Sequence, residues 1–170
     1  MVGEKTNIVL IGMPGSGKST VGVLLAKRMR KKFVDTDLFI QEQEERLLSE
    51  IIEEEGLERF IEIENEVNAT LLTENSVIAP GGSAVYGKAA MQHFREIAKI
   101  VYLRLSYESV ESRLGDLKKR GVAVRPGQTL FDLYKERCPL YEAYADVIVD
   151  CDDLELGETL ERVVEQVIYC

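Results

Sequence analysis

A glycine-rich segment near the N-terminus limits the fold more than any other feature of this sequence. The segment satisfies the pattern GxxxxGK[ST] at every fixed position, and it reads Gly12-Met13-Pro14-Gly15-Ser16-Gly17-Lys18-Ser19. It directly follows the apolar run Ile8–Ile11 and precedes Thr20–Lys32, whose apolar residues have helical spacing. A strand, such a loop and a helix in this order form a P-loop, so the sequence predicts a nucleotide-binding α/β fold.

The chemistry of this loop predicts a site for ATP and Mg²⁺. Glycines let successive backbone N–H groups turn inward, and the following helix adds the positive end of its dipole. We expect Lys18 to contact the β- and γ-phosphates and the Ser19 hydroxyl to ligate Mg²⁺. The complete set of expected nucleotide-binding residues in the loop and helix is Gly12, Gly15, Ser16, Gly17, Lys18, Ser19 and Thr20. A P-loop alone does not distinguish a kinase from a GTPase, an ATPase or a nucleotide sensor.

Further strand-length apolar runs alternate with helix-patterned segments along the chain. The predicted strands are Ile8–Ile11, Phe33-Val34, Val77–Ala79, Ile100–Leu103 and Val147–Val149. Between and after them, Leu38–Leu72 reads as two or three helices interrupted near Gly56, and Leu156–Tyr169 as a closing helix. This order predicts a three-layer α/β/α fold of the P-loop NTPase type, with a mostly parallel five-stranded sheet.

Size and charge narrow the class of protein. The chain has 170 residues, of which 45% are hydrophobic, so we expect one domain spanning residues 1–170. Its net charge of −9 disfavours binding to nucleic acid or to an anionic membrane. The N-terminal apolar run is too short for a signal peptide or a membrane span. The three cysteines are widely separated in the sequence, so we expect reduced thiols rather than disulfides or zinc ligands. We therefore expect a cytoplasmic protein.

Two polar segments follow predicted strands, where ligands bind in sheets of this type. Asp35-Thr36-Asp37 places two carboxylates on one side of an extended segment, so that one could hold Mg²⁺ and the other could bind or deprotonate a substrate hydroxyl. The alternative is a helix N-cap or a turn. Gly81-Gly82, within Pro80–Ser83, would let a ligand approach the backbone closely, although a simple tight turn would look the same.

The motifs together resemble those of shikimate kinases in order and spacing over nearly the whole chain. They are the P-loop, Asp35-Thr36-Asp37, the glycine turn, Arg125-Pro126 and Arg137-Cys138-Pro139-Leu140-Tyr141-Glu142. The resemblance implies transfer of phosphoryl from ATP to shikimate, giving shikimate 3-phosphate for aromatic amino acid biosynthesis. We expect the protein to be a monomer.

The resemblance also implies roles for individual residues on the acceptor side. Asp35 is similar to the family's magnesium-associated aspartate, and Asp37 to the aspartate that binds the acceptor's hydroxyls and serves as the candidate catalytic base. Gly82 matches a glycine whose backbone contacts the acceptor, and we expect the adjacent Gly81 to lie at the substrate as well. Arg137 resembles one of two arginines that grip the acceptor's carboxylate. A guanidinium suits that role because it forms fork-shaped hydrogen bonds with a carboxylate.

A lid and a set of acceptor-binding helices complete the expected site. The stretch 114–128 contains three closely spaced basic residues, glycines and a proline, so we expect it to be a mobile lid. By resemblance, Arg125 is the lid arginine that reaches the nucleotide phosphates and takes part in catalysis, and Arg120 is a second lid cation. The helices at about 38–72 are expected to bind the acceptor.

Three departures from the family pattern leave the acceptor open. Ile61 follows Phe60 where the family has an arginine, Ser83 ends the usual triple-glycine turn, and Gly127-Gln128 replaces leucines in the lid. Loss of one charge-assisted contact costs about 1.5–3 kcal/mol, which is enough to change the preferred acceptor. Another small hydroxy acid or polyol such as gluconate is therefore the alternative substrate, and a regulatory nucleotide-binding module without kinase activity is an alternative of another class. A nucleoside monophosphate kinase fits Asp35-Thr36-Asp37 poorly.

Overall fold

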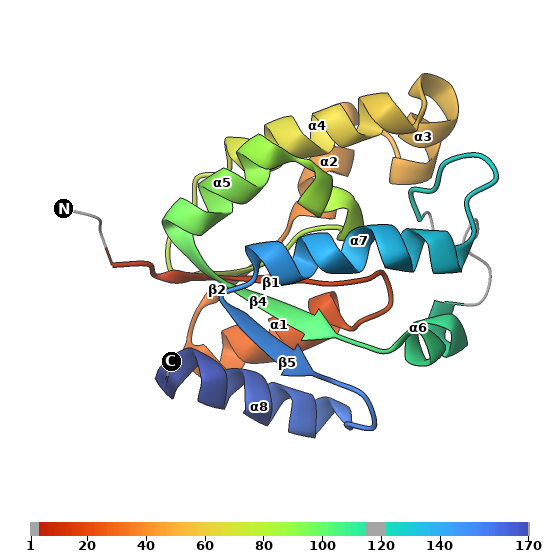
Figure 1. Ribbon diagram of the computed structural model, residues 1–170. Helices are drawn as coiled ribbons and strands as arrows, with labels where there is room; N and C mark the ends of the chain where they lie inside the picture. The colour runs from red at the N-terminus through yellow and green to blue at the C-terminus, as the bar shows by residue number, and fades with distance from the viewer. Residues whose placement is uncertain (1–3, 115–121, 170) are drawn as a thin grey trace.

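The computed structural model describes residues 4–114 and 122–169, and these build a five-stranded parallel sheet (Figure 1). The strand order is β2-β3-β1-β4-β5, with all four neighbouring pairs parallel. The strands are β1 (Asn7–Ile11), β2 (Lys32–Asp35), β3 (Ser76–Ala79), β4 (Ala98–Arg104) and β5 (Val147–Asp150). Each predicted strand is therefore present, and the predicted three-layer α/β/α fold is confirmed.

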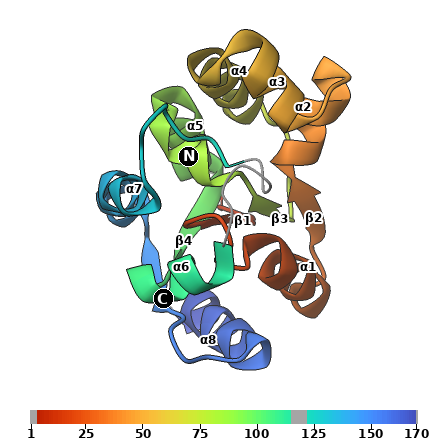
Figure 2. The same cartoon turned by 90° about the vertical axis from the view of Figure 1, so that its right-hand side faces the viewer.

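Helices cover both faces of the sheet, which explains why its central strands are apolar on both sides. All five residues of β1 are buried, as are all four of β3. The helices α1 (Lys18–Met29) and α8 (Leu156–Tyr169) lie on one face, and α5 (Lys88–Ile97) and α7 (Leu130–Tyr144) lie on the other (Figure 2). A short helix, α6 (Tyr107–Leu114), follows β4.

Three helices between β2 and β3 project from the sheet and have a small core of their own. They are α2 (Thr36–Glu44), α3 (Leu48–Glu55) and α4 (Leu57–Ala69). Gly56 separates α3 from α4 with φ of 88°, a conformation that favours glycine. Their buried residues pack with Ala123 from the segment after α6, forming a cluster of Ile40, Ile51, Phe60, Ile63 and Ala123. The expectation of two or three helices interrupted near Gly56 is thus confirmed as three.

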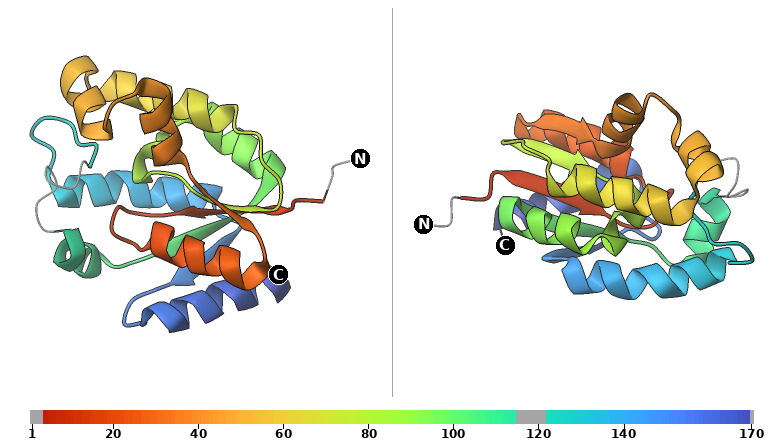
Figure 3. Two further views of the ribbon diagram at one scale, coloured as in Figure 1. Left: turned by 180° about the vertical axis from the view of Figure 1, so that it is seen from behind. Right: turned by 90° about the horizontal axis from the view of Figure 1, so that it is seen from above.

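The carboxyl ends of the strands point toward the end of the molecule that carries α3 and α6. The end of α8 lies at the opposite end (Figure 1, Figure 3). The P-loop and the segments after β2 and β3 therefore meet at one edge, which is where parallel sheets of this type bind ligands.

Some expected boundaries were wrong by a few residues for local reasons. Helix α1 begins at Lys18 and ends at Met29, rather than spanning Thr20–Lys32, because Arg30 takes a left-handed conformation with φ of 56°. Residues of the predicted lid lie partly outside the described part of the chain, which resumes at Val122. Within the described ranges, no helix is long and apolar enough to span a bilayer.

Candidate active site

The glycine-rich segment forms a tight loop between β1 and α1. Gly15 and Gly17 have φ of 77° and 90°, where a side chain would be strained. The backbone N–H of Ser16 donates to the carbonyl oxygen of Met13 at 3.1 Å, which closes the turn. A Cβ atom on Gly12 would lie 2.8 Å from the carbonyl oxygen of Leu103, so this glycine lets the loop start close against β4. The loop leads directly into the N-terminus of α1, an end that attracts anions.

Lys18 is the first residue of α1, and its side chain folds back into the loop. Its Nζ atom donates to the carbonyl oxygens of Gly12 and Met13, each at 2.9 Å. Burial lowers the pKa of Lys18 to about 8, although the negative charge of Asp37 opposes this shift. The ammonium therefore lies where phosphate oxygens entering the loop would replace its carbonyl partners.

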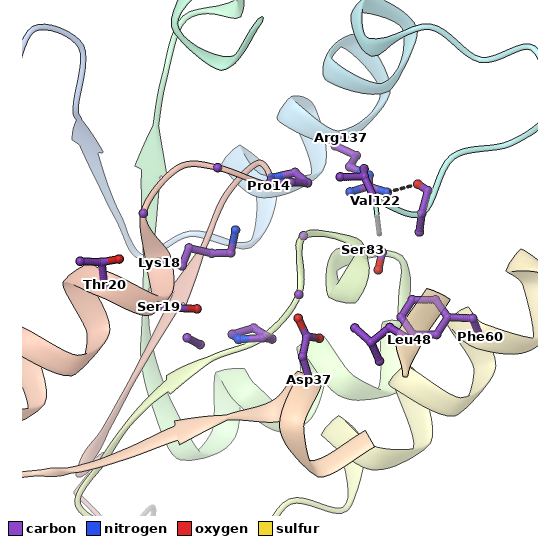
Figure 4. A pocket seen from close by; sticks show the side chains of 17 residues that line it. Pro14, Lys18, Ser19, Thr20, Asp37, Leu48, Phe60, Ser83, Val122 and Arg137 are labelled. Atoms are coloured by element: carbon purple, nitrogen blue, oxygen red, sulfur yellow. Dashed lines mark hydrogen bonds between the residues drawn. The ribbon is translucent and has the colours of Figure 1, made fainter. Parts of the chain in front are cut away.

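A cavity of about 320 Å³ lies beside the loop and collects residues from distant parts of the chain (Figure 4). Lys18, Ser19 and Thr20 come from α1. Asp37 comes from α2, and Arg137 from α7. Gly15, Gly17, Gly81 and Gly82 line it as well, whereas Gly12 and Ser16 support the loop without lining the cavity. The structure thus brings most of the sequence-predicted site residues to one place.

The two aspartates after β2 occupy different structural positions. Strand β2 ends at Asp35, whose Oδ1 atom accepts a hydrogen bond from the backbone N–H of Asp37 at 3.0 Å. Asp35 is therefore the N-cap of α2, and Asp37 lies in the first helical turn. The expectation that both carboxylates extend from one side of a strand was wrong, because the helix starts at Thr36. Asp37 lines the cavity, and Asp35 does not.

The carboxylate of Asp37 has the properties of a general base. Its Oδ1 atom is buried and has no hydrogen-bond partner among the described residues. Burial raises the pKa of Asp37 to about 6, with a further increase from the negative charge of Asp35 and an opposing effect from Lys18. A carboxylate with its pKa raised toward neutrality accepts a proton more readily than an exposed aspartate, as base catalysis requires.

Gly81 and Gly82 let the backbone after β3 pass close to its neighbours in the cavity. Gly81 lies against Asp37 and Glu64, and Gly82 lies against Pro14 and Arg137. A Cβ atom on Gly81 would lie 2.9 Å from both Asp37 Oδ1 and Glu64 Oε1. A Cβ atom on Gly82 would lie 2.9 Å from Pro14 of the P-loop and 3.1 Å from Arg137 Nη1. Any side chain here would fill the space that the two carboxylates and the guanidinium face.

Arg137 is a fully buried arginine that lines the cavity from α7, with 1% of its surface exposed. Its Nη2 atom donates to the carbonyl oxygen of Ala123 at 2.7 Å, and its Nε atom donates to the hydroxyl of Tyr86 at 3.2 Å. These contacts fix two nitrogens of the guanidinium and leave Nη1 next to Gly82. A buried cation held in this way can bind an anionic group of a ligand.

Glu64 is a buried carboxyl group that the sequence reasoning did not select. It lies on α4 with 1% exposure, and its Oε2 atom accepts a hydrogen bond from the Ser83 hydroxyl at 2.5 Å. Its Oε1 atom is buried without a partner among the described residues. Burial raises the pKa of Glu64 to about 7. The signal was present in the sequence, because Glu64 has the same helical spacing as the buried residues Phe60 and Ile63.

Neither of the predicted lid arginines is among the described residues that line the cavity. Arg120 lies outside the described residues. Arg125 does not line the cavity; its Nη1 atom instead pairs with Glu136 at 2.8 Å, and its Nε atom lies 3.5 Å from Glu58. A role for Arg125 at the nucleotide phosphates therefore requires its guanidinium to move.

Comparison with known proteins identifies the family. The family model described as shikimate kinase matches residues 14–168. A shikimate kinase from Moorella thermoacetica is 37% identical over 161 residues, which are 94% of this chain and 92% of the relative. One from Pseudomonas paraeruginosa is also 37% identical, over 92% of this chain and 95% of the relative.

The chain belongs to the shikimate kinase family. It is accordingly an ATP-dependent kinase that transfers a phosphoryl group to a hydroxyl group, and its sequence resemblance to this family is confirmed. A solved shikimate kinase from Acinetobacter baumannii, described as being in complex with shikimate, superposes with a TM-score of 0.85 at 28% identity, covering 95% of this chain and 92% of the other.

The position after Phe60, where the resemblance to shikimate kinases leads us to expect an arginine, is apolar in this chain. Ile61 is half-buried and packs on the small core of α2, α3 and α4, while Phe60 and Leu48 line the cavity. Arg59 does not line the cavity; it is 45% exposed and pairs with Glu62 at 3.0 Å on the outer side of α4. Among the cavity-lining residues in the described ranges, Lys18 and Arg137 are the cations.

Proposed function

We propose that this chain transfers the γ-phosphoryl group of ATP to a hydroxyl group of shikimate, giving ADP and shikimate 3-phosphate. One observation carries the proposal: Lys18, Asp37 and Arg137 line a single cavity although they come from three separate elements (Figure 4). A phosphate-binding cation, a base and a buried carboxylate-binding cation are the groups that this reaction needs.

The nucleotide half of the site works by positioning and charge neutralisation. The P-loop backbone and the start of α1 hold the phosphates, and Lys18 offsets negative charge that accumulates on the β- and γ-phosphate oxygens. Gly15, Gly17, Ser19 and Thr20 line this side of the cavity, so the triphosphate would lie along the first turn of α1.

The acceptor half holds the attacking hydroxyl in line with the γ-phosphate. Arg137 would bind the carboxylate of shikimate, and Gly81 and Gly82 leave room for its ring next to Asp37. The unpartnered Oδ1 of Asp37 accepts the proton of the attacking hydroxyl as the new P–O bond forms. Alignment of the two reactants by these contacts supplies much of the rate acceleration.

Mg²⁺ fits the oxygen groups near the loop, and we include it in the proposal. Within residues 4–114 and 122–169, no cluster of three or more His, Cys, Asp or Glu side chains would hold a metal by itself. Mg²⁺ commonly binds through one or two protein oxygens together with substrate phosphates. The Ser19 hydroxyl would hold it with the nucleotide, and the Asp35 carboxylate, which does not line the cavity, would hold it through water. The ion would neutralise phosphate charge.

The proposal extends to a monomer that works in the cytoplasm. We expect a monomer, because Lys18, Asp37 and Arg137 of one chain supply the phosphate-binding cation, the base and the acceptor-binding cation. The buried, free thiols of Cys138 and Cys151 suit a reducing compartment. Light scattering would contradict the first point if the purified protein were a stable dimer.

A second candidate is the same reaction with another small hydroxy acid or polyol such as gluconate. It is favoured because neither Ile61 nor the outward-facing Arg59 brings a positive charge to the cavity. Arg137 is then the cation on the acceptor side among the described cavity residues. The nucleotide-binding module without kinase activity is less well supported, because Asp37 and Arg137 both line the cavity.

A panel of acceptors, assayed by coupled detection of ADP release, separates these candidates. We expect turnover with shikimate, and Ile61→Arg should lower its KM by about tenfold or more if the added guanidinium reaches the carboxylate. Glu62→Arg is the matched control, since it adds an arginine at the next, outward-facing position. Turnover of another hydroxy acid without turnover of shikimate would favour the second candidate, and ATP binding without any transfer would favour the regulatory module.

A further inference from the structure

Tyr86 lies in contact with both arginines that the proposed function uses. It is the last residue of the 3-10 helix η1 (Gly82–Tyr86), which follows the glycine turn. The guanidinium carbon of Arg137 lies 5.3 Å from the centre of its ring, and that of Arg125 lies 5.7 Å from it. The Tyr86 hydroxyl also accepts the hydrogen bond from Arg137 Nε at 3.2 Å.

Glu136 joins this tyrosine to the lid arginine. The Tyr86 hydroxyl donates to Glu136 Oε1 at 2.5 Å, and the same oxygen accepts from Arg125 Nη1 at 2.8 Å. Its other oxygen accepts from Gln128 at 3.3 Å. Hydrogen bonds from Tyr86 and Arg125 lower the pKa of Glu136, so the carboxylate is charged. One hydroxyl and one carboxylate oxygen thus connect Arg137 with Arg125.

We propose that Tyr86 is a positioning residue that orients Arg137 toward the acceptor, and that Glu136 retains Arg125 outside the cavity through the same group of contacts. The inference rests on the proposed function, which assigns Arg137 to the acceptor and Arg125 to the nucleotide. With Ala123 holding Nη2 and Tyr86 holding Nε, Nη1 faces Gly82 and the cavity. Arg125 reaches the nucleotide phosphates only after it leaves Glu136, its nearer carboxylate partner at 2.8 Å, and Glu58 at 3.5 Å.

Tyr86→Phe tests the first part, because it keeps the ring and removes the hydroxyl. The acceptor KM should rise about three- to tenfold, the effect expected for the net loss of one hydrogen bond, while kcat stays near wild type. Tyr107→Phe is the matched control, since it removes a surface hydrogen bond of the same type, 3.1 Å long, to Glu111. An unchanged acceptor KM in folded Tyr86→Phe, as shown by thermal melting, would overturn this role.

Glu136→Gln tests the second part without any acceptor. If Glu136 retains Arg125, its loss should tighten binding of Mg-ATP about three- to tenfold in calorimetry, since Arg125 no longer has to break a charge-assisted pair. Glu142→Gln makes the same charge change on α7, where Glu142 lies 3.9 Å from Arg104, and should leave the affinity unchanged. Equal affinities for wild type and Glu136→Gln would refute retention. Failure of the proposed function would appear differently, as wild-type protein that does not phosphorylate shikimate.

Discussion

Replacing Glu64 by glutamine should change the pH dependence of stability in a way that only a buried carboxyl explains. Glu64 is the buried carboxyl group of α4, and its hydrogen bond comes from Ser83. Burial raises its pKa from 4.5 to about 7, the Ser83 bond partly opposes this, and the negative charge of Asp37 raises it further. Glutamine has nearly the same shape and keeps hydrogen-bonding groups for Ser83, but it cannot ionise.

The sign and size of the effect follow from linkage. A carboxyl group whose pKa is raised in the folded state stabilises the fold fully below its unfolded pKa, and this contribution is lost as the pH rises through the folded pKa. For Glu64 the loss therefore falls between about pH 4.5 and pH 7. At about 1.4 kcal/mol per pKa unit, wild type should lose about 2–3 kcal/mol relative to Glu64→Gln between pH 5 and pH 8.

Urea unfolding followed by circular dichroism at pH 5 and pH 8 measures this difference. Other titrating groups are common to both proteins, so they largely cancel in the comparison. Glu62→Gln, on the exposed side of the same helix, serves as the control and should show no pH-dependent difference. If the difference in unfolding free energy between wild type and Glu64→Gln were the same at both pH values, the burial argument for Glu64 would be wrong.

Three further predictions concern catalysis. Lys18→Ala should lower kcat by at least about a hundredfold, because charge on the transferring phosphoryl loses its buried counter-ion, and a smaller loss in steady-state assays would contradict this role. Arg137→Ala should mainly raise the acceptor KM, by about ten- to a hundredfold, and an unchanged KM would refute its assignment to the acceptor. The kcat/KM for ATP should fall below about pH 6, as Asp37 gains a proton, and above about pH 8, as Lys18 loses one. Asp37→Asn, which has no base to protonate, should be nearly inactive at every pH.

The fold could be predicted from the sequence because its signals are local. A P-loop after an apolar run fixes a strand, a turn and a helix, and the remaining apolar runs alternate with helical segments. Even Phe33-Val34, the weakest candidate, proved to be part of β2. Helix ends were less predictable, since the left-handed conformation of Arg30 that ends α1 has no glycine to mark it.

The site was predictable only where a motif carries it. Lys18, Asp37 and Arg137 belong to recognisable motifs, and all three line the cavity. Tyr86 and Glu64 were missed because their importance arises from contacts between segments far apart in the sequence. Tyr86 bonds to Glu136, 50 positions away, and Glu64 bonds to Ser83, 19 positions away. The extended geometry expected for Asp35 and Asp37 failed because a capping hydrogen bond starts α2 between them.

The most direct test of the central claim is whether purified protein moves the terminal phosphoryl group of Mg-ATP onto shikimate. Phosphorus NMR of the reaction mixture identifies the product without relying on coupling enzymes. The predicted result is equal formation of ADP and shikimate 3-phosphate, abolished by Asp37→Asn. Tight binding of Mg-ATP with no phosphorylated product from shikimate would contradict the account.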